Sequence, residues 1–237
     1  MSLFDRYHQQ ITAFVAACHR LAFLRMVVSE GGNCAWRLDE NCILITPTRR
    51  EKQALTPEDL VFIDLRGNVL AGGRPTGETP IYLKFFTQRP DVCSIIHCHP
   101  PFACAAAIMK GRNWLERPFF PEAVIEVGPV PLVPYAQPLS QRLADQFDPF
   151  LQKYNCFLMQ NHGVVAMTSG DIGRALMTVE LLEATACSLV AALQCGDINE
   201  LDRTAVAELD EVMRIRNLPL FGAPGLNRSL VDLYFAG

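Results

Sequence analysis

The sequence predicts an α/β protein in which a central sheet is covered by helices on both faces. Stretches with an apolar residue every three or four positions alternate with short, continuous apolar stretches, which indicates alternating helices and strands. No linker, repeat or low-complexity segment divides the 237 residues, half of which are apolar. Because a chain of this length can bury a sizeable core, we expect one sheet between two layers of helices.

The first third of the chain is expected to form a helix followed by two hairpins. Residues 3–28 repeat apolar residues at helical spacing until the polar and glycine-rich residues 29–33 break the pattern. Residues 34–38 and 42–46 read as two strands around a turn, and residues 60–64 and 69–70 as a second pair. A short helical turn at residues 56–59 lies between the hairpins, with Thr56 as its cap and Pro57 at its first position.

The rest of the chain is expected to alternate between helix and strand. A loop over residues 72–77 precedes a helix from Glu78 to about Gln88, and a buried strand follows over residues 92–97. Further helices are predicted at residues 100–109, 139–153 and 171–194, and further strands at residues 124–127, 132–133, 156–160 and 164–167. A last helix begins near Asp202, and the apolar end of the chain is expected to dock on the body or on a neighbouring subunit.

Composition excludes several classes of function. The net charge of −4 argues against a protein that binds nucleic acid by neutralising phosphates. The N-terminus lacks an apolar signal core, and no stretch approaches 18 uninterrupted apolar residues, so we expect a cytoplasmic protein that does not enter a membrane. The nine cysteines lie mostly in apolar segments and form no CxxC pair, which indicates buried free thiols rather than a thiolate metal site.

Three of the five histidines lie where strands are expected to end, as His97-Cys98-His99 and as His162 in Asn161-His162-Gly163. Residues i and i+2 of a strand point to the same face, so His97 and His99 can bind one ion. A lone histidine on an apolar strand is more often an ordinary core residue. Burying two adjacent imidazoles without a shared partner is costly, however, and three imidazoles with an open position are typical of catalytic zinc. A metal-dependent enzyme is therefore the leading interpretation.

Loops that could bind an anion surround these histidines in the sequence. Glu78 opens a helix, where a first-turn acid is favourable in itself, but Thr76 and Gly77 before it place a hydroxyl and free amides at the helix N-terminus. The glycine-rich residues 31–33 form a second loop of this kind, and residues 46–50, with two arginines, form a third. Together they predict a phosphorylated substrate.

The order of these motifs resembles the class II aldolase/adducin family over about residues 5–195. The matching motifs are Gly32-Asn33, Thr46-Pro47-Thr48, Thr76-Gly77-Glu78, His97-Cys98-His99 and Asn161-His162-Gly163. The resemblance implies a three-layer α/β/α sandwich with a mainly antiparallel central sheet. It also implies a homotetramer with active sites at subunit interfaces, in which residues 1–200 form the catalytic domain and residues 201–237 a C-terminal helical tail.

The resemblance further implies roles for individual residues. His97, His99 and His162 would bind Zn²⁺, or another divalent metal, and Glu78 would both ligate the resting metal and act as the acid/base. The substrate phosphate would be held by Gly32, Asn33, Thr48, Arg49, Thr76 and Gly77. The implied activity is that of a zinc-dependent aldolase, which cleaves a ketose such as a fuculose- or rhamnulose-1-phosphate-like sugar to dihydroxyacetone phosphate and an aldehyde. The family's aldolases have glutamate at position 78, whereas its 4-epimerases have aspartate.

Three alternatives share these motifs. A sugar-phosphate epimerase and a 3-oxo acid phosphate decarboxylase use the same enolate chemistry, and an adducin-like module would be non-catalytic. The chain also departs from the fuculose-phosphate aldolase pattern. Arg49 replaces a glycine, Gly77 replaces a serine, Tyr82 replaces a histidine that commonly follows the acidic residue, and no tyrosine lies between Glu116 and Val127.

Overall fold

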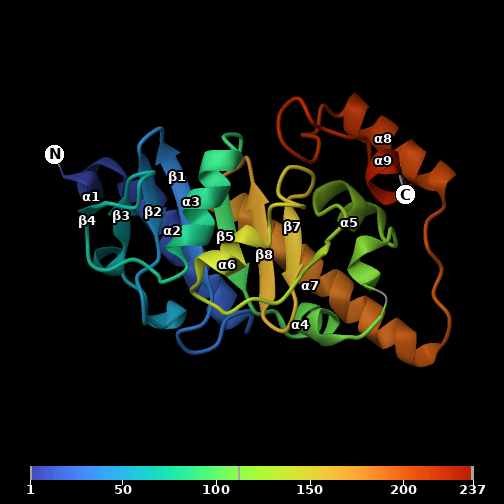
Figure 1. Cartoon of the computed structure of the whole chain (residues 1–237), viewed down its shortest axis with the longest axis horizontal. Coiled ribbons are helices and arrows are strands. Elements are labelled where there is room, and N and C mark those ends of the chain that lie inside the picture. The colour runs from blue at the N-terminus through green and yellow to red at the C-terminus, as the bar shows by residue number, and fades with distance from the viewer. Residues whose placement is uncertain (1, 112, 236–237) are drawn as a thin grey trace.

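The structure is a computed structural model that describes residues 2–111 and 113–235, and these residues contain one eight-stranded sheet (Figure 1). The strands lie in the order β4-β3-β2-β1-β5-β8-β7-β6. Neighbouring strands are antiparallel except β6 and β7, which are parallel. The strand bounds are Asn33–Asp39 (β1), Cys42–Ile45 (β2), Val61–Ile63 (β3), Val69–Ala71 (β4), Ser94–Cys98 (β5), Leu132–Val133 (β6), Cys156–Met159 (β7) and Gly163–Thr168 (β8). The predicted, mainly antiparallel central sheet is confirmed.

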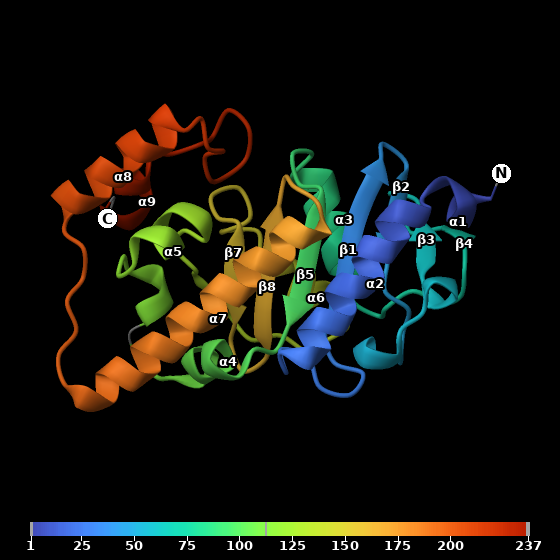
Figure 2. The ribbon, with the colours of Figure 1, turned by 180° about the vertical axis from the view of Figure 1, so that it is seen from behind.

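Helices cover both faces of the sheet and complete the three layers. The helix bounds are Leu3–Arg6 (α1), His8–Phe23 (α2), Thr79–Gln88 (α3), Pro101–Ile108 (α4), Pro121–Glu126 (α5), Gln141–Asp145 (α6), Ile172–Cys195 (α7), Arg203–Ile215 (α8) and Leu230–Phe235 (α9), with 3-10 turns at Lys52–Ala54, Pro57–Asp59 and Trp114–Glu116. Helices α2, α4 and α7 lie on one face (Figure 2), and α3 and α6 on the other (Figure 1).

Strand β5 shows how the sheet separates two cores. Ile96 and Cys98 belong to the core beneath α2 and α7, whereas Ile95 belongs to the core beneath α3. Since side chains alternate along a strand, His97 faces the same side as Ile95 and therefore lies toward α3. Because of this alternation, a site that includes His97 must lie on the face of the sheet that α3 covers.

Three predicted elements differ from the structure. The helix predicted over residues 3–28 is interrupted at Tyr7 and ends at Phe23, two residues before Arg25 takes a φ of 58°. The strand predicted at residues 124–127 is wrong, because these residues belong largely to helix α5. Pro121 occupies its first turn with a φ suited to a helix, and Val124 packs into a third apolar cluster formed by α5, α8 and α9.

The helix predicted at residues 139–153 is short. It begins after Ser140, whose hydroxyl accepts from the Leu143 amide, but regular helix ends at Asp145. Pro149 disfavours helical backbone at the residue before it and cannot donate an amide hydrogen bond, so residues 146–153 form turns instead.

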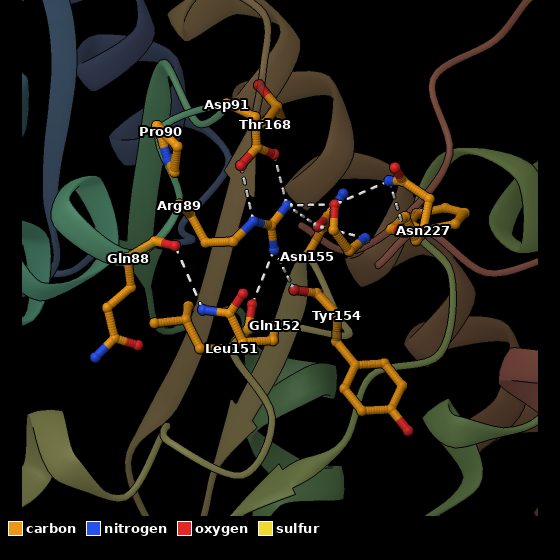
Figure 3. Close-up of polar contacts among 12 residues, drawn as sticks. Gln88, Arg89, Pro90, Asp91, Leu151, Gln152, Tyr154, Asn155, Thr168 and Asn227 are labelled. Atoms are coloured by element: carbon orange, nitrogen blue, oxygen red, sulfur yellow. Dashed lines mark hydrogen bonds and ion pairs between the residues drawn. The ribbon is translucent and has the colours of Figure 1, made fainter. Parts of the chain in front are cut away.

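The C-terminal segment folds back over one edge of the sheet. Its helices α8 and α9 pack with α5, and Val231, Leu233, Tyr234 and Phe235 join that cluster. The loop between the two helices is held by Arg89, which is 1% exposed at the end of α3 (Figure 3). Its guanidinium donates to the carboxylate of Asp91, to the carbonyl oxygens of Leu151, Tyr154 and Gly222, and to the side-chain oxygen of Asn155.

Helix α7 is long and apolar enough to cross a membrane by length and composition. In this structure it packs against β5, β8, α2 and α4, and its buried side chains, which include Ile172, Val179 and Leu182, belong to the core.

The nine cysteines are free thiols: five are buried, three are intermediate, and Cys195 is exposed.

Candidate metal centre and active site

Three neighbouring strands bring the candidate ligands to one end of the sheet. Strand β5 lies between β1 and β8, and His97 pairs with Asn33 on one side and with Val165 on the other. His162 immediately precedes β8, and His99 follows β5, so the three histidines meet where these strands turn. Glu78 is the N-cap residue of α3, which lies over the same face.

The side-chain donor atoms converge on one point. One ring nitrogen from each of the three histidines lies within 4.8 Å of the others, and the Nε2 atoms of His97 and His99 are 3.1 Å apart. The Glu78 carboxylate is 3.4 Å from His97 Nε2 and 3.7 Å from His162 Nε2. Zinc–nitrogen bonds of about 2.0–2.1 Å at tetrahedral angles separate two donors by about 3.4 Å. The donor set therefore fits a divalent metal ion.

Surrounding groups orient the imidazole of His97 and keep those of His99 and His162 unprotonated, as metal binding requires. His97 Nδ1 donates to the Val164 carbonyl oxygen at 2.8 Å, which leaves the lone pair of Nε2 directed at the centre. Burial, followed by the charge of His97, lowers the pKa of His99 to about 3 and that of His162 to about 4. Both rings are therefore neutral near pH 7, as metal ligands must be.

Two glycines allow the backbone to approach the rings closely. Gly32 has a φ of +66°, and a Cβ atom there would lie 2.5 Å from Val27 Cγ1 and 2.8 Å from the His97 carbonyl oxygen. A Cβ atom at Gly163 would lie 2.5 Å from His99 Cδ2 and 2.6 Å from the Cys98 carbonyl oxygen. Any larger residue at either position would displace the histidine strand.

Glu78 is buried, with 4% of its surface exposed, and its carboxylate accepts a hydrogen bond of 2.8 Å from Asn33 Nδ2. Burial alone would raise the pKa of Glu78. The charge of His97 and the Asn33 hydrogen bond outweigh that effect, so the pKa lies below its ordinary value. An ionised carboxylate thus stands beside the three imidazoles, where it can act as a ligand or as a base.

All ten residues predicted for the site line one cavity of about 520 Å³. His97, His99, His162 and Glu78 lie together, and Gly32, Thr48, Arg49 and Gly77 line the same space. Asn33 and Thr76 are already engaged with Glu78: the Asn33 amide donates to its carboxylate, and the Thr76 hydroxyl accepts from its backbone amide at 3.3 Å. The Asn33 side chain therefore holds the Glu78 carboxylate, and the Thr76 side chain holds the Glu78 backbone, in addition to lining the cavity.

Five residues that line the cavity are not among the ten predicted site residues: Glu30, Gly31, Pro47, Arg74 and Leu139. Arg74 joins the cavity because the Thr48 amide donates to the Arg74 carbonyl oxygen at 3.0 Å, which places the two loops side by side. Because Arg74 lies in the same loop as Thr76 and Gly77, the sequence could have predicted that it lines the site. Leu139 lies against Gly77 with a φ of 63°, and no sequence motif links these distant positions.

Comparisons with known proteins agree with this architecture. Residues 12–190 match the Class II Aldolase and Adducin N-terminal domain. The chain is 34% identical over 186 residues to 3-oxo-tetronate 4-phosphate decarboxylase from Haemophilus influenzae, which covers 77% of this chain and 87% of the relative. It is also 34% identical over 173 residues to L-fuculose phosphate aldolase from Methanococcus maripaludis, covering 73% of this chain and 92% of that protein.

A solved structure shows the same fold. The crystal structure of YgbL from Klebsiella pneumoniae superposes with a TM-score of 0.79 at 29% identity, over 85% of this chain and 98% of that one. The match in sequence covers the whole sheet from β1 to β8 and every residue of the metal centre. The chain therefore belongs to the class II aldolase and adducin family.

Proposed function

We propose that this metal-dependent enzyme breaks a carbon–carbon bond beside the carbonyl group of a phosphorylated substrate. One observation carries the proposal: three imidazoles and the ionised Glu78 converge in a cavity whose lining includes the exposed cations Arg49 and Arg74. The two arginines can bind a phosphate, and the histidines with Glu78 can bind a metal ion. One cavity that holds both groups fits a substrate with a phosphate at one end and a carbonyl near the other.

His97, His99 and His162 would hold the ion, and Glu78 would complete the set before substrate arrives. A divalent ion held there would supply a Lewis acid that stabilises negative charge on the substrate's carbonyl oxygen. We propose Zn²⁺ as that ion. Glu78 would move the proton to or from the carbon beside the carbonyl, since a carboxylate held within reach of the reacting carbon serves as a general acid/base.

Aldol cleavage is the first candidate reaction. The hydroxyl group on the carbon that becomes the aldehyde would pass its proton through water to the Glu78 carboxylate. The carbon–carbon bond next to that carbon breaks, the aldehyde leaves, and the bonding electrons pass to the carbonyl oxygen to give an enediolate. Protonation of that enediolate by Glu78 yields dihydroxyacetone phosphate. The similarity to L-fuculose phosphate aldolase supports this candidate.

Decarboxylation of a 3-oxo acid phosphate is the second candidate. The bond to the carboxylate breaks, carbon dioxide leaves, and the electrons pass to the 3-oxo group, so that the same enediolate results from a 3-oxo-tetronate 4-phosphate. A tyrosine could exchange a proton with the oxygen of the aldehyde as it leaves, but the described residues that line the cavity include no tyrosine. Loss of carbon dioxide needs no such residue. The similarity to 3-oxo-tetronate 4-phosphate decarboxylase supports it equally.

One experiment tests the shared half-reaction. The zinc-loaded protein would be incubated with dihydroxyacetone phosphate in deuterated water, and exchange of the hydroxymethyl proton followed by NMR. We expect stereospecific exchange that a chelator abolishes. Condensation with added aldehydes would then identify an aldolase, and release of carbon dioxide from 3-oxo-tetronate 4-phosphate a decarboxylase. A metal-loaded protein without exchange, condensation or carbon dioxide release would disprove the proposal.

Replacing Glu78 by glutamine tests the acid/base role. Glu78→Gln keeps the shape of the side chain but removes its basic oxygen, so proton exchange should fall at least about 100-fold. Metal content measured on the same sample at saturating metal should show that the ion is still bound by the three remaining imidazoles, even though its affinity is lower. Glu183→Gln is a matched control, because Glu183 is a half-buried carboxylate that accepts from the Phe102 and Ala103 amides of α4, away from the cavity. Full exchange in Glu78→Gln would rule out the assigned role.

We further propose that the enzyme is a cytoplasmic homotetramer with active sites at subunit interfaces. The support is the family resemblance of the motifs around the cavity. Sedimentation velocity on the purified chain would give four copies per particle, and a monomer with full activity would contradict the proposal.

A further inference from the structure

A buried chain of hydrogen bonds leads from helix α3 to the catalytic carboxylate. Tyr82, one turn after Glu78 on α3, is 1% exposed, and its hydroxyl donates to the Asn33 carbonyl oxygen at 2.7 Å. The same hydroxyl proton is shared with Asn33 Oδ1, the side-chain oxygen of that residue. The other end of that side chain, Asn33 Nδ2, donates to Glu78 Oε2 at 2.8 Å.

The two ends of the asparagine amide have different chemistry, and this gives the chain a direction. A hydroxyl donor at Oδ1 and a carboxylate acceptor at Nδ2 satisfy the amide in one orientation. If the amide rotated by half a turn, Oδ1 would face the carboxylate oxygen and the two would repel each other. The Tyr82 hydroxyl and the Glu78 carboxylate therefore together favour the orientation in which the amide donates to Glu78.

We propose that Tyr82 is a positioning residue that acts through Asn33 to fix the carboxylate of Glu78. The inference rests on the proposed role of Glu78. With Oε2 held by Asn33 and lying 3.4 Å from His97 Nε2, the carboxylate can rotate little, and Oε1 is directed toward His162. A fixed carboxylate is ready both to ligate the ion and to meet the substrate carbon, which is the usual effect of outer partners on metal sites.

A purely structural role for Tyr82 makes a different prediction. The ring packs in the core beneath α3 with Phe85 and Ile95, and a buried hydroxyl needs some acceptor in any case. If that were its whole role, Tyr82→Phe would lower stability and leave turnover unchanged. If Tyr82 positions Glu78, the same substitution keeps the packing and lowers kcat about 10- to 100-fold while KM changes little.

Tyr7→Phe is the matched control. Tyr7 is also a buried tyrosine, 7% exposed, and its hydroxyl donates to Asp39 at the far end of β1 from Asn33. Its removal should cost stability, as the loss of a buried hydroxyl does, but kcat should stay within about twofold of the original enzyme. An equal loss of kcat in both variants would assign the effect to stability and overturn the proposal.

A double-mutant cycle tests whether Tyr82 acts through Asn33. In an Asn33→Ala background no amide remains to be oriented, so adding Tyr82→Phe should lower kcat by less than about twofold. If Tyr82→Phe lowers kcat by the same factor in both backgrounds, Tyr82 does not act through Asn33 and the proposal fails.

Metal affinity provides a readout that needs no turnover. A loosened Glu78 should weaken cobalt(II) binding about 10- to 100-fold in Tyr82→Phe, and Tyr7→Phe should bind as the original protein does. The titration would be followed by visible absorption of the bound ion. An inactive original protein would disprove the proposed function, whereas unchanged cobalt affinity in Tyr82→Phe would disprove the positioning role, so the two failures are distinguishable.

Discussion

At the residue scale, the fold keeps the imidazoles of His99 and His162 neutral, and this lowers the stability of the folded protein in acid. The pKa values of His99 and His162 fall from 6.5 to about 3 and about 4, chiefly because of burial. In the unfolded chain these rings take up protons below pH 6.5, whereas in the folded apoprotein they do not. The free energy of unfolding should therefore fall as the pH decreases from 6.5 toward 4, by at most about 1.4 kcal/mol per pH unit and ring.

Urea unfolding of the metal-free protein at a series of pH values would check this. In His162→Gln one of the two titrating groups is gone, so the slope below pH 6.5 should become shallower. Saturating metal should also stabilise the folded state by mass action. A stability that is flat between pH 7 and pH 5, or the same slope in His162→Gln, would show that burial does not suppress protonation.

The rim of the cavity carries two cations with no partner in the described chain. The Arg49 and Arg74 side chains make no ion pair there, whereas Arg50, next to Arg49 in the sequence, pairs with Asp59 at 3.0 Å. If these guanidiniums bind the substrate phosphate, Arg74→Ala should raise KM for dihydroxyacetone phosphate about 10-fold and change kcat little, since an exposed charged hydrogen bond contributes on the order of 1–2 kcal/mol. Steady-state exchange kinetics would measure both constants.

Arg50→Ala is the control for that experiment, because it removes the same charge from the adjacent loop, where the Arg50 side chain is paired with Asp59. An equal rise of KM in both variants would indicate a general effect of charge. No rise in Arg74→Ala would remove Arg74 from the phosphate site.

At the element scale, most of the architecture could be predicted because the sequence signals are local. The histidine pair at the end of β5 follows from strand alternation, and the helix after Glu78 follows from the loop before it. Helix α5 could not be predicted in this way. Val124 and Ile125 resemble a strand, and only their contact with the distant α8 and α9 shows why a helix is stable there.

The same reasoning explains what could be predicted of the site. The ten residues share one cavity because each motif lies at an end of a strand or at the start of a helix, and strand order brings those ends together. The direction of the Asn33 side chain is not a local property. It depends on Tyr82 and Glu78, which become neighbours of β1 only when α3 packs over the sheet.

At the scale of the whole molecule, Arg89 joins the C-terminal segment to the sheet at the end opposite the metal centre. Strand β8 starts at Gly163, beside His99, and ends at Thr168, beside the guanidinium network in Figure 3. A six-residue strand spans about 20 Å, so the two sites are well separated. Changes at Arg89 should therefore affect stability without altering metal binding.

Arg89→Met should destabilise the protein by roughly 3–5 kcal/mol, because it leaves the buried acceptors and the Asp91 carboxylate without their cation. Arg89→Lys should recover only part of that loss, since an ammonium group cannot reach three carbonyls and a carboxylate at once. Asn227→Ala removes weaker bonds from the same loop, to the Phe221 and Gly222 carbonyls, and should cost about 1 kcal/mol. Urea unfolding would rank the three variants, and limited proteolysis should cleave the loop between α8 and α9 first in Arg89→Met. If Arg89→Met also weakened cobalt(II) binding, the two ends of the sheet would be coupled. The C-terminal segment would then affect the metal centre as well as the edge of the sheet that it covers.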